Sequence, residues 1–204
     1  TAILREELEV VRRLWTQELT SFEGEYFSLK DAICNPKPVQ SPCPPVWIGI
    51  SDSRNLLPRL SAEYADCVQI SVANDEVYKE RLADIASACR EVGRDYDEIV
   101  KSRKIYLHIT DEPNYDIREQ LPKHAAQIGQ EDLLAAYWFM EDGYHTRLVG
   151  TVDKVTDGLK RMVDQGTDDF VLQFFAPDAP MGGDIDAVVG SMEIFAKEIM
   201  PAVR

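Results

Sequence analysis

Short apolar runs alternate with helical patterns along most of the chain, and this alternation constrains the fold more than any other feature. Four runs have the length of a buried strand, at residues 46–49, 67–71, 103–110 and 169–175. Apolar residues at helical spacing predict helices at residues 2–18, 54–64, from 74 to Gly93, from 151 to Gly166, and over the stretch from Val188 to Ile199. Strands that alternate with helices of this length predict parallel βαβ units, and therefore an α/β fold in a single domain, residues 1–204.

Residues 14–50 carry a pattern that helix or strand propensity does not explain. The stretch LWTQELTSFEGEYFSLKDAICNPKPVQSPCPPVWIGI indicates a helix end, a short hairpin around Gly24, a proline-rich extended segment and then the buried strand 46–49. Its prolines impose an extended path with few backbone donors. Gly49 closes the strand at a position where a side chain would crowd whatever lies beyond it.

As a whole, this stretch resembles the luciferase-like monooxygenase superfamily, the flavin- and deazaflavin-dependent oxidoreductases with a (β/α)8 fold. Members carry a similar segment that ends in WIGG, where this chain has Ile50 in place of the second glycine. The family's ADG motif is represented by Ala65-Asp66 followed by Cys67, and its GRD motif is matched by 93–95, which we expect to end a helix and begin a loop.

The resemblance implies a TIM barrel of the bacterial luciferase type, of which this chain covers about strands five to eight. A closed barrel needs about 250 residues and eight βα units, whereas this sequence of 204 residues supplies four predicted strands. We expect either a fragment of a longer polypeptide or a shortened homologue. A half barrel leaves two strand edges unpaired, so the sequence predicts a homo-oligomer or pairing with a missing N-terminal half. Residues 111–147 are predicted as a helix-rich excursion after the third strand.

Charge and composition restrict the partners. Lys and Arg number 22 against 36 Asp and Glu, a net charge of −14 that argues against nucleic acid or an anionic membrane as partner. No apolar run approaches the roughly 20 residues of a membrane span. The four cysteines have no CxxC spacing and are interpreted as reduced thiols of a cytoplasmic protein, and the three histidines are too scattered to predict a metal site.

In (β/α)8 barrels the functional groups follow the carboxyl ends of the strands. After the first strand, residues 49–53 combine a glycine turn with hydroxyls before a helix, an arrangement suited to a cofactor phosphate. An ordinary serine-capped turn is the alternative. Gly49, Ile50 and Ser51, with Ser71 after the second strand, are therefore the candidate cofactor-binding residues, and the resemblance adds that relatives use this turn near the cofactor. Ile50 would obstruct close approach of the backbone.

Two further polar residues lie on the later strands. His108 is a candidate proton donor to a reduced flavin or to substrate, and Gln173 a candidate donor to the isoalloxazine edge; plain packing is the alternative for both. Asp168 and Asp169 form a carboxylate pair, but they precede a strand and so belong to the stability end.

The resemblance implies an oxidoreductase that uses FMN or coenzyme F-420 for hydride transfer or oxygenation of a small organic substrate. The cofactor carries that chemistry, so no nucleophile and base pair is required. The alternative is a shortened, non-catalytic flavin-binding or structural partner protein. One structural expectation follows: if strand 46–49 lies inside a barrel wall, Trp47 and Ile48 are both buried, on opposite faces.

Overall fold

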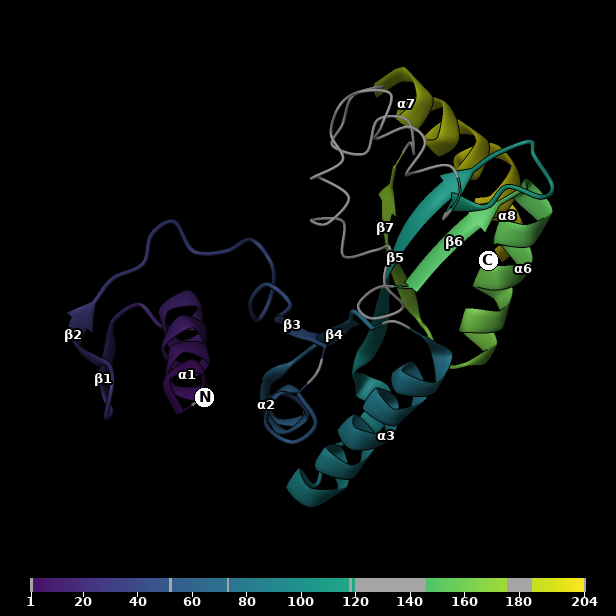
Figure 1. The fold of residues 1–204 in the computed structure, drawn as a ribbon. Coiled ribbons are helices and arrows are strands. Elements are labelled where there is room, and N and C mark those ends of the chain that lie inside the picture. Colours follow the sequence, from purple (N-terminus) through teal and green to yellow (C-terminus); the bar gives the residue numbers. More distant parts are fainter. Residues whose placement is uncertain are drawn as a thin grey trace.

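The computed structural model describes residues 2–51, 53–72, 74–117, 119, 146–175 and 185–203, and its centre is a parallel sheet. The strands are β3 (Trp47–Ile50), β4 (Cys67–Ile70), β5 (Val100–Ile109), β6 (Thr146–Gly150) and β7 (Asp169–Phe174), in the order β3-β4-β5-β6, with β7 also paired to β5. The long strand β5 pairs first with β4 and farther along with β6, while β7 lies along its other edge (Figure 1). The predicted α/β class with a parallel sheet is confirmed.

Helices α2, α3, α6 and η2 cover one face of this sheet. The helices of the described part are α1 (Ala2–Thr16), α2 (Leu56–Tyr64), α3 (Asp75–Val92), the short 3-10 helix η1 (Tyr96–Glu98), α6 (Val152–Asp164), α7 (Ile185–Ile194), the π-helical η2 (Phe195–Ile199) and α8 (Met200–Val203). One core cluster joins β3 and β4 to α2 and α3, and contains Ile48, Ile50, Val68, Ile70, Leu60, Tyr78 and Ile85. A second joins β5 and β6 to α6 and η2, and contains Ile105, Leu107, Ile109, Leu148, Leu159, Met162 and Ile199.

The proline-rich stretch follows the predicted hairpin, β1 (Thr20–Glu23) with β2 (Ser28–Ala32). The carboxylate of Glu6 on α1 accepts hydrogen bonds from the backbone N–H groups of residues 25, 26 and 27 at 2.8, 2.9 and 3.2 Å. A Cβ at Gly24 would collide with that carboxylate, so glycine is needed at this turn for space. Lys37 donates from Nζ to the carbonyls of Leu14 and Gln17 at 2.7 and 2.5 Å, and thereby caps the end of α1.

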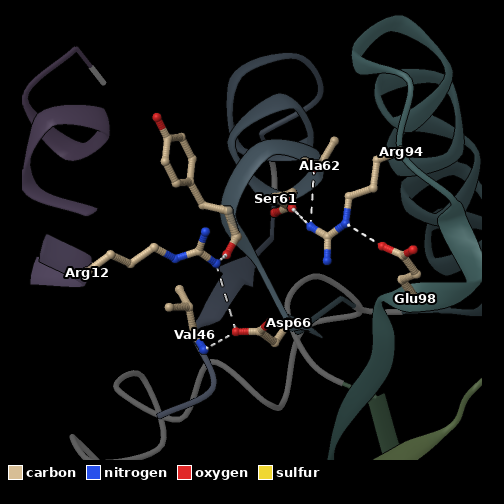
Figure 2. A network of polar contacts seen from close by, with 8 residues as sticks. Arg12, Val46, Ser61, Ala62, Asp66, Arg94 and Glu98 are labelled. Carbon is tan, nitrogen blue, oxygen red and sulfur yellow. Dashed lines mark hydrogen bonds and ion pairs between the residues drawn. The ribbon is translucent and has the colours of Figure 1, made fainter. Parts of the chain in front are cut away.

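The two family motifs outside this stretch hold neighbouring elements together (Figure 2). Asp66 accepts a hydrogen bond from the backbone N–H of Val46 at 2.7 Å, and Arg12 of α1 lies 4.0 Å from the same carboxylate. Arg94 donates to the carbonyls of Ser61 and Ala62 at the end of α2. Gly93 ends α3 with φ of 72°, as predicted, and the side chain of Asp95 caps η1.

Several predicted boundaries shift by a few residues. Helix α2 begins at Leu56 rather than at residue 54, and β5 begins at Val100 rather than at 103. The side chains of Asn74 and Thr151 cap α3 and α6, each accepting a hydrogen bond from the backbone N–H three residues on. Strand β6 was not predicted, and most of the excursion predicted at 111–147 lies outside the described residues. No helix of the described part is long and apolar enough to cross a membrane.

The expectation that Trp47 is buried is wrong for this chain. Ile48 is 6% exposed and packs under α2 and α3, whereas Trp47 on the opposite face is 49% exposed. Alternating side chains of a strand point to opposite faces, and among the described elements no helix covers the face on which Trp47 lies. Burial on both faces therefore requires something beyond the described residues.

Candidate functional site

The face of the sheet that points away from the helices is the candidate site, and we call it the inner face. Strand pairing assigns its members, because paired residues of parallel strands project to the same side. Gly49 pairs with Gln69, Gln69 with Ser102, and Ser102 with Asp169. Extending this alternation gives the inner-face residues Trp47, Gly49, Cys67, Gln69, Val100, Ser102, Lys104, Tyr106, His108, Arg147, Val149, Asp169, Val171 and Gln173.

One row of the inner face, formed by the paired residues Gly49, Gln69, Ser102 and Asp169, is polar and has an open position at Gly49. Gly49 is exposed, and a Cβ built there meets no atom within 4 Å, so the backbone is open to a ligand from this side. Across the row, the hydroxyl of Ser102 donates to the carboxylate of Asp169 at 2.9 Å. Cys67 lies beside this pair, and burial, helped by the charge of Asp169, raises the pKa of its thiol to about 11. The thiol is therefore neutral and adds no charge to the inner face.

A second row lies farther toward the carboxyl ends of the strands. Tyr106 pairs with Arg147 on one side and with Gln173 on the other. Gln173 is exposed, so its amide is available on this face. Lys104, one inner-face position before Tyr106, places its ammonium 5.2 Å from the centre of the Tyr106 ring.

His108 stands one inner-face position beyond that row. Its Nδ1 lies 3.2 Å from the carbonyl oxygen of Phe175, and its ring lies 5.2 Å from that of Tyr115 and 5.7 Å from that of Phe175. A carbonyl oxygen only accepts, so Nδ1 carries the proton in this contact.

The turn after β3 differs from its predicted form. Ile50 continues the strand, and its side chain is 2% exposed within the core under the helices. Its side chain therefore does not obstruct the inner face, which corrects that expectation. Ser51 is exposed, and Ser53 accepts a hydrogen bond from the backbone N–H of Leu57 at 3.2 Å, so this hydroxyl helps to cap α2. Residue 52 lies outside the described residues.

Strand pairing separates the predicted site residues along the sheet. Gly49 lies level with Ser102 in the ladder, and His108 stands six residues farther along β5, about 20 Å at the usual rise of a strand. Ser71 donates its N–H to the carbonyl of Ile50 at 3.0 Å and lies one residue beyond the pair of Ile70 with Arg103. The predicted residues thus share a face without forming one cluster.

The first member of the carboxylate pair, Asp168, contacts Lys101 on β5. Asp168 accepts from the backbone N–H of Lys101 at 3.0 Å and forms an ion pair with its Nζ at 2.9 Å. Asp168 therefore fastens the beginning of β7 to β5, in keeping with its predicted place at the stability end.

Sequence reasoning missed Lys104, Tyr106 and Arg147. The first two could have been found, because they precede the candidate His108 by four and two residues on one strand and so share its face. Arg147 becomes part of the face only through the pairing of β6 with β5. Among the described residues, no group of histidine, cysteine and carboxylate side chains is placed to hold a metal ion.

A groove of about 280 Å³ lies on the opposite, outer side, between α2 and α3. Arg54 on its rim is already paired with Glu80 and Asp84 at 3.4 and 3.7 Å. The groove lies among α2 and α3, on the helix side of the sheet, and none of its lining residues belongs to the inner face.

Comparison with known proteins decides the family. The family model described as luciferase-like monooxygenase matches residues 1–169. The chain belongs to this family. It is 24% identical to the pyrimidine monooxygenase RutA of Klebsiella pneumoniae, over 98% of this chain and 57% of that protein. It is 32% identical to the F-420-dependent glucose-6-phosphate dehydrogenase of Segniliparus rotundus, over 55% of this chain and 33% of that protein.

Solved structures show the same fold. The coenzyme F-420-dependent tetrahydromethanopterin reductase of Methanopyrus kandleri superposes with a TM-score of 0.74 at 17% identity, over 100% of this chain and 63% of that one. An F-420-dependent secondary alcohol dehydrogenase superposes with a TM-score of 0.72 at 22% identity, over 98% and 60%. This family member spans about half the length of the curated relatives it matches over most of its own length.

Proposed function

We propose that this chain forms strands five to eight of a luciferase-like (β/α)8 barrel, which binds FMN or coenzyme F-420 and oxidises or reduces a small organic substrate. In this assignment β3, β4, β5 and β7 are the barrel strands, and β6 is an extra strand that extends the wall along β5. The other half of the wall is supplied by an N-terminal half of the barrel or by a second copy of the chain.

One observation carries the proposal: within the described part of the chain, the polar face of the sheet is the face that no helix covers. Gly49 and Gln173 are exposed there, while the opposite face carries the two apolar core clusters. Closure into a barrel covers Trp47 and turns the remaining polar groups toward a ligand.

The edges of the sheet support the same closure. In the described part of the chain, β3 pairs only with β4, and β7 pairs only with β5. Each therefore has an outer edge at which a further strand could pair, as expected of the first and last strands of a half barrel.

The residues of the inner face fit a flavin or deazaflavin. The open backbone at Gly49 suits a phosphate, with Ser51 two residues on and Ser71 joined to Ile50 by its backbone N–H. The exposed amide of Gln173 suits the hydrogen-bonding edge of a ring system. His108, whose Nδ1 donates to the carbonyl of Phe175, is the candidate for proton transfer to the cofactor or the substrate. The cofactor, when bound, supplies the hydride or oxygen chemistry, and these residues bind, orient and exclude water.

The relatives' names agree with this range. They include a pyrimidine monooxygenase, an EDTA monooxygenase and F-420-dependent dehydrogenases. The substrate is accordingly a small organic molecule, and the cofactor is FMN or coenzyme F-420. The strongly acidic surface, with net charge −14, favours no nucleic acid partner, and we expect a cytoplasmic protein.

The test is a binding titration of the purified chain with FMN and, separately, with coenzyme F-420, followed by fluorescence. Gly49→Leu places a side chain over the open backbone and should weaken binding at least tenfold. Gly190→Leu is the matched control, because a Cβ there also meets no atom within 4 Å but lies on α7. Equal binding by both variants would place the cofactor elsewhere. Binding without turnover by the reassembled barrel would favour the non-catalytic alternative.

A further inference from the structure

We infer that the partner docking on the free edges of this sheet is the N-terminal half of a barrel, with four parallel strands and three helices, and that it is not a second copy of the chain. The inference rests on the proposed function only in taking the sheet as half of a barrel wall. It decides between the two partners that could supply the other half, and it names the surfaces through which that partner docks.

The number of helices excludes a closed barrel of two identical copies. In the described part of the chain, the four barrel strands β3, β4, β5 and β7 come with five long helices, α1, α2, α3, α6 and α7. A closed (β/α)8 barrel has eight strands and one outer helix for each of them. Two copies would supply eight strands but ten helices, so two helices would have no place in the ring. A partner with four strands and three helices completes it.

The surplus arises because the chain has a helix beyond each edge strand. Helix α1 precedes β3 and packs on α2, where Arg5 forms an ion pair with Glu63 at 2.8 Å. It lies on the side of α2 away from α3, and so occupies the gap beyond the free edge of β3 (Figure 1). At the other end α7 follows β7 and runs on into η2, whose Phe195 ring lies 5.6 Å from that of Phe174 on β7.

These two helices would collide in a dimer of identical halves. Right-handed crossovers place the helix that follows a strand toward the next strand of the wall. If β7 of one copy paired with β3 of another, α7 of the first copy and α1 of the second would both occupy the single gap between those strands. Repulsion adds to this conflict, because each copy carries a net charge of −14.

Apolar side chains mark the surface of α7 that the partner covers. Ile185, Val189 and Met192 follow one another at intervals of four and three residues, so they lie on one side of the helix. They are 70%, 45% and 45% exposed, whereas Ile194 of the same helix packs on the second core cluster. A neighbouring helix in the outer ring would cover this row, as the strand partner of β3 would cover Trp47 at the other edge.

The matched proteins have room for such a half. The chain covers 57% of RutA and 63% of the Methanopyrus kandleri reductase, so about two-fifths of each protein lies outside the match.

The test is sedimentation equilibrium of the full chain, alone and mixed with the part of the Methanopyrus kandleri reductase outside the match, expressed as a separate polypeptide. We expect no homodimer and a one-to-one complex. Met192→Glu should weaken that complex at least tenfold, because it places a charge in an apolar contact. Val163→Glu is the matched control, since it places the same charge at an exposed apolar position of α6, away from both edges of the sheet. Circular dichroism confirms that each variant is folded.

Three results would overturn the inference. They are a homodimer that Met192→Glu dissociates and Val163→Glu leaves intact, a complex that both variants form equally well, and the absence of any complex with wild type. Titration of the assembled species with FMN and with coenzyme F-420 tests the proposed function separately. A one-to-one complex that binds neither cofactor would refute the proposed function and leave the docking surface standing, whereas a homodimer that binds one of them would do the reverse.

Discussion

The charge of Arg103 is the most deeply buried in the described part of the protein, and removing its partner should be costly. Arg103 is 0% exposed, on the helix-facing side of β5. It donates to Asp75 at 2.8 Å and to the side-chain oxygen of Gln165 at 3.3 Å, and its guanidinium lies 4.4 Å from the ring of Tyr78. Asp75 also accepts from Gln165 at 2.9 Å, so one carboxylate ties the start of α3 to β5 and to the end of α6.

Asp75→Ala should lower the free energy of unfolding by about 3–5 kcal/mol, the usual cost of leaving a buried charge without its partner. The exposed contact with Arg161, at 3.4 Å, adds no more than about 1 kcal/mol. Asp153→Ala is the matched control: it also removes an acid from the first turn of a helix, but from an exposed position, and should cost only about 0.3–1 kcal/mol. Urea unfolding followed by circular dichroism measures both. In a protein of this size the loss expected for Asp75→Ala corresponds to a fall of roughly 6–20 °C in Tm.

The pH dependence provides an independent check. Burial alone would raise the pKa of Asp75, but hydrogen bonds from Gln165 and Arg103 and the charges of Arg103 and Arg161 more than offset it, so the pKa is lowered. A lowered carboxyl pKa contributes stability above the unfolded value of about 3.9, and that contribution is lost as the pH falls through the folded value. The gap between wild type and Asp75→Ala should therefore be constant from pH 7 to 5 and shrink below about pH 4.

Two results would refute the reasoning. One is an Asp75→Ala variant no less stable than Asp153→Ala. The other is a double variant, Arg103→Met with Asp75→Leu, that is as unstable as Asp75→Ala, because removing both charges should recover most of the loss.

Three further predictions follow from local contacts. Lys37→Met should cost about 1–3 kcal/mol through loss of two capped carbonyls at the end of α1, while Lys30→Met at an exposed position of β2 should cost almost nothing in the same urea assay. A thiol reagent at pH 8 should modify Cys34 and Cys43, which are half-buried, and spare Cys67 and Cys89, because burial raises the pKa of both buried thiols; rapid labelling of Cys67, detected by peptide mass spectrometry, would contradict this. Gly93→Ala should destabilise by about 1–2 kcal/mol, because φ of 72° is strained for alanine although space is open, whereas Gly190→Ala within α7 should stabilise slightly.

Features governed by neighbours in sequence were predictable. The caps at Asn74 and Thr151 and the αL residue Gly93 depend on side chains within one helical turn, and the structure has all three. Strand β6 was missed because it is short and acquires its place from pairing with β5, more than thirty residues earlier in the chain. Burial of Trp47 failed as a prediction for a similar reason, since it depends on what covers the face and not on the strand itself.

The candidate site shows the same division between local and long-range information. Strand alternation could have assigned Ile50 to the side of Ile48, and therefore to the core, and Lys104 to the side of His108. It could not show that Gly49 and His108 occupy different levels, because the offset is set by the pairing of three strands. Alternation along each strand therefore predicts from sequence which residues share a face of the sheet. How far apart those residues lie depends on the register between strands, which the sequence does not show.

Register also orders the site residues by height within the proposed barrel. A shear of eight over eight strands advances the ladder by about one residue per strand at constant height. Gly49 is level with Ser102 across two strand steps, so its height on β5 is that of Lys104. Gln173 on β7 pairs with Tyr106 on β5. After the shift of about one residue for this strand step, Gln173 lies within about one residue of the height of Gly49 and Lys104 along the barrel axis. Gly49, Lys104 and Gln173 thus form one ring of the inner face, while His108 stands four residues higher, at the mouth. In such a barrel, a ligand that contacts Gly49 would also lie beside Gln173, and it would reach His108 only through a part that extends toward the mouth.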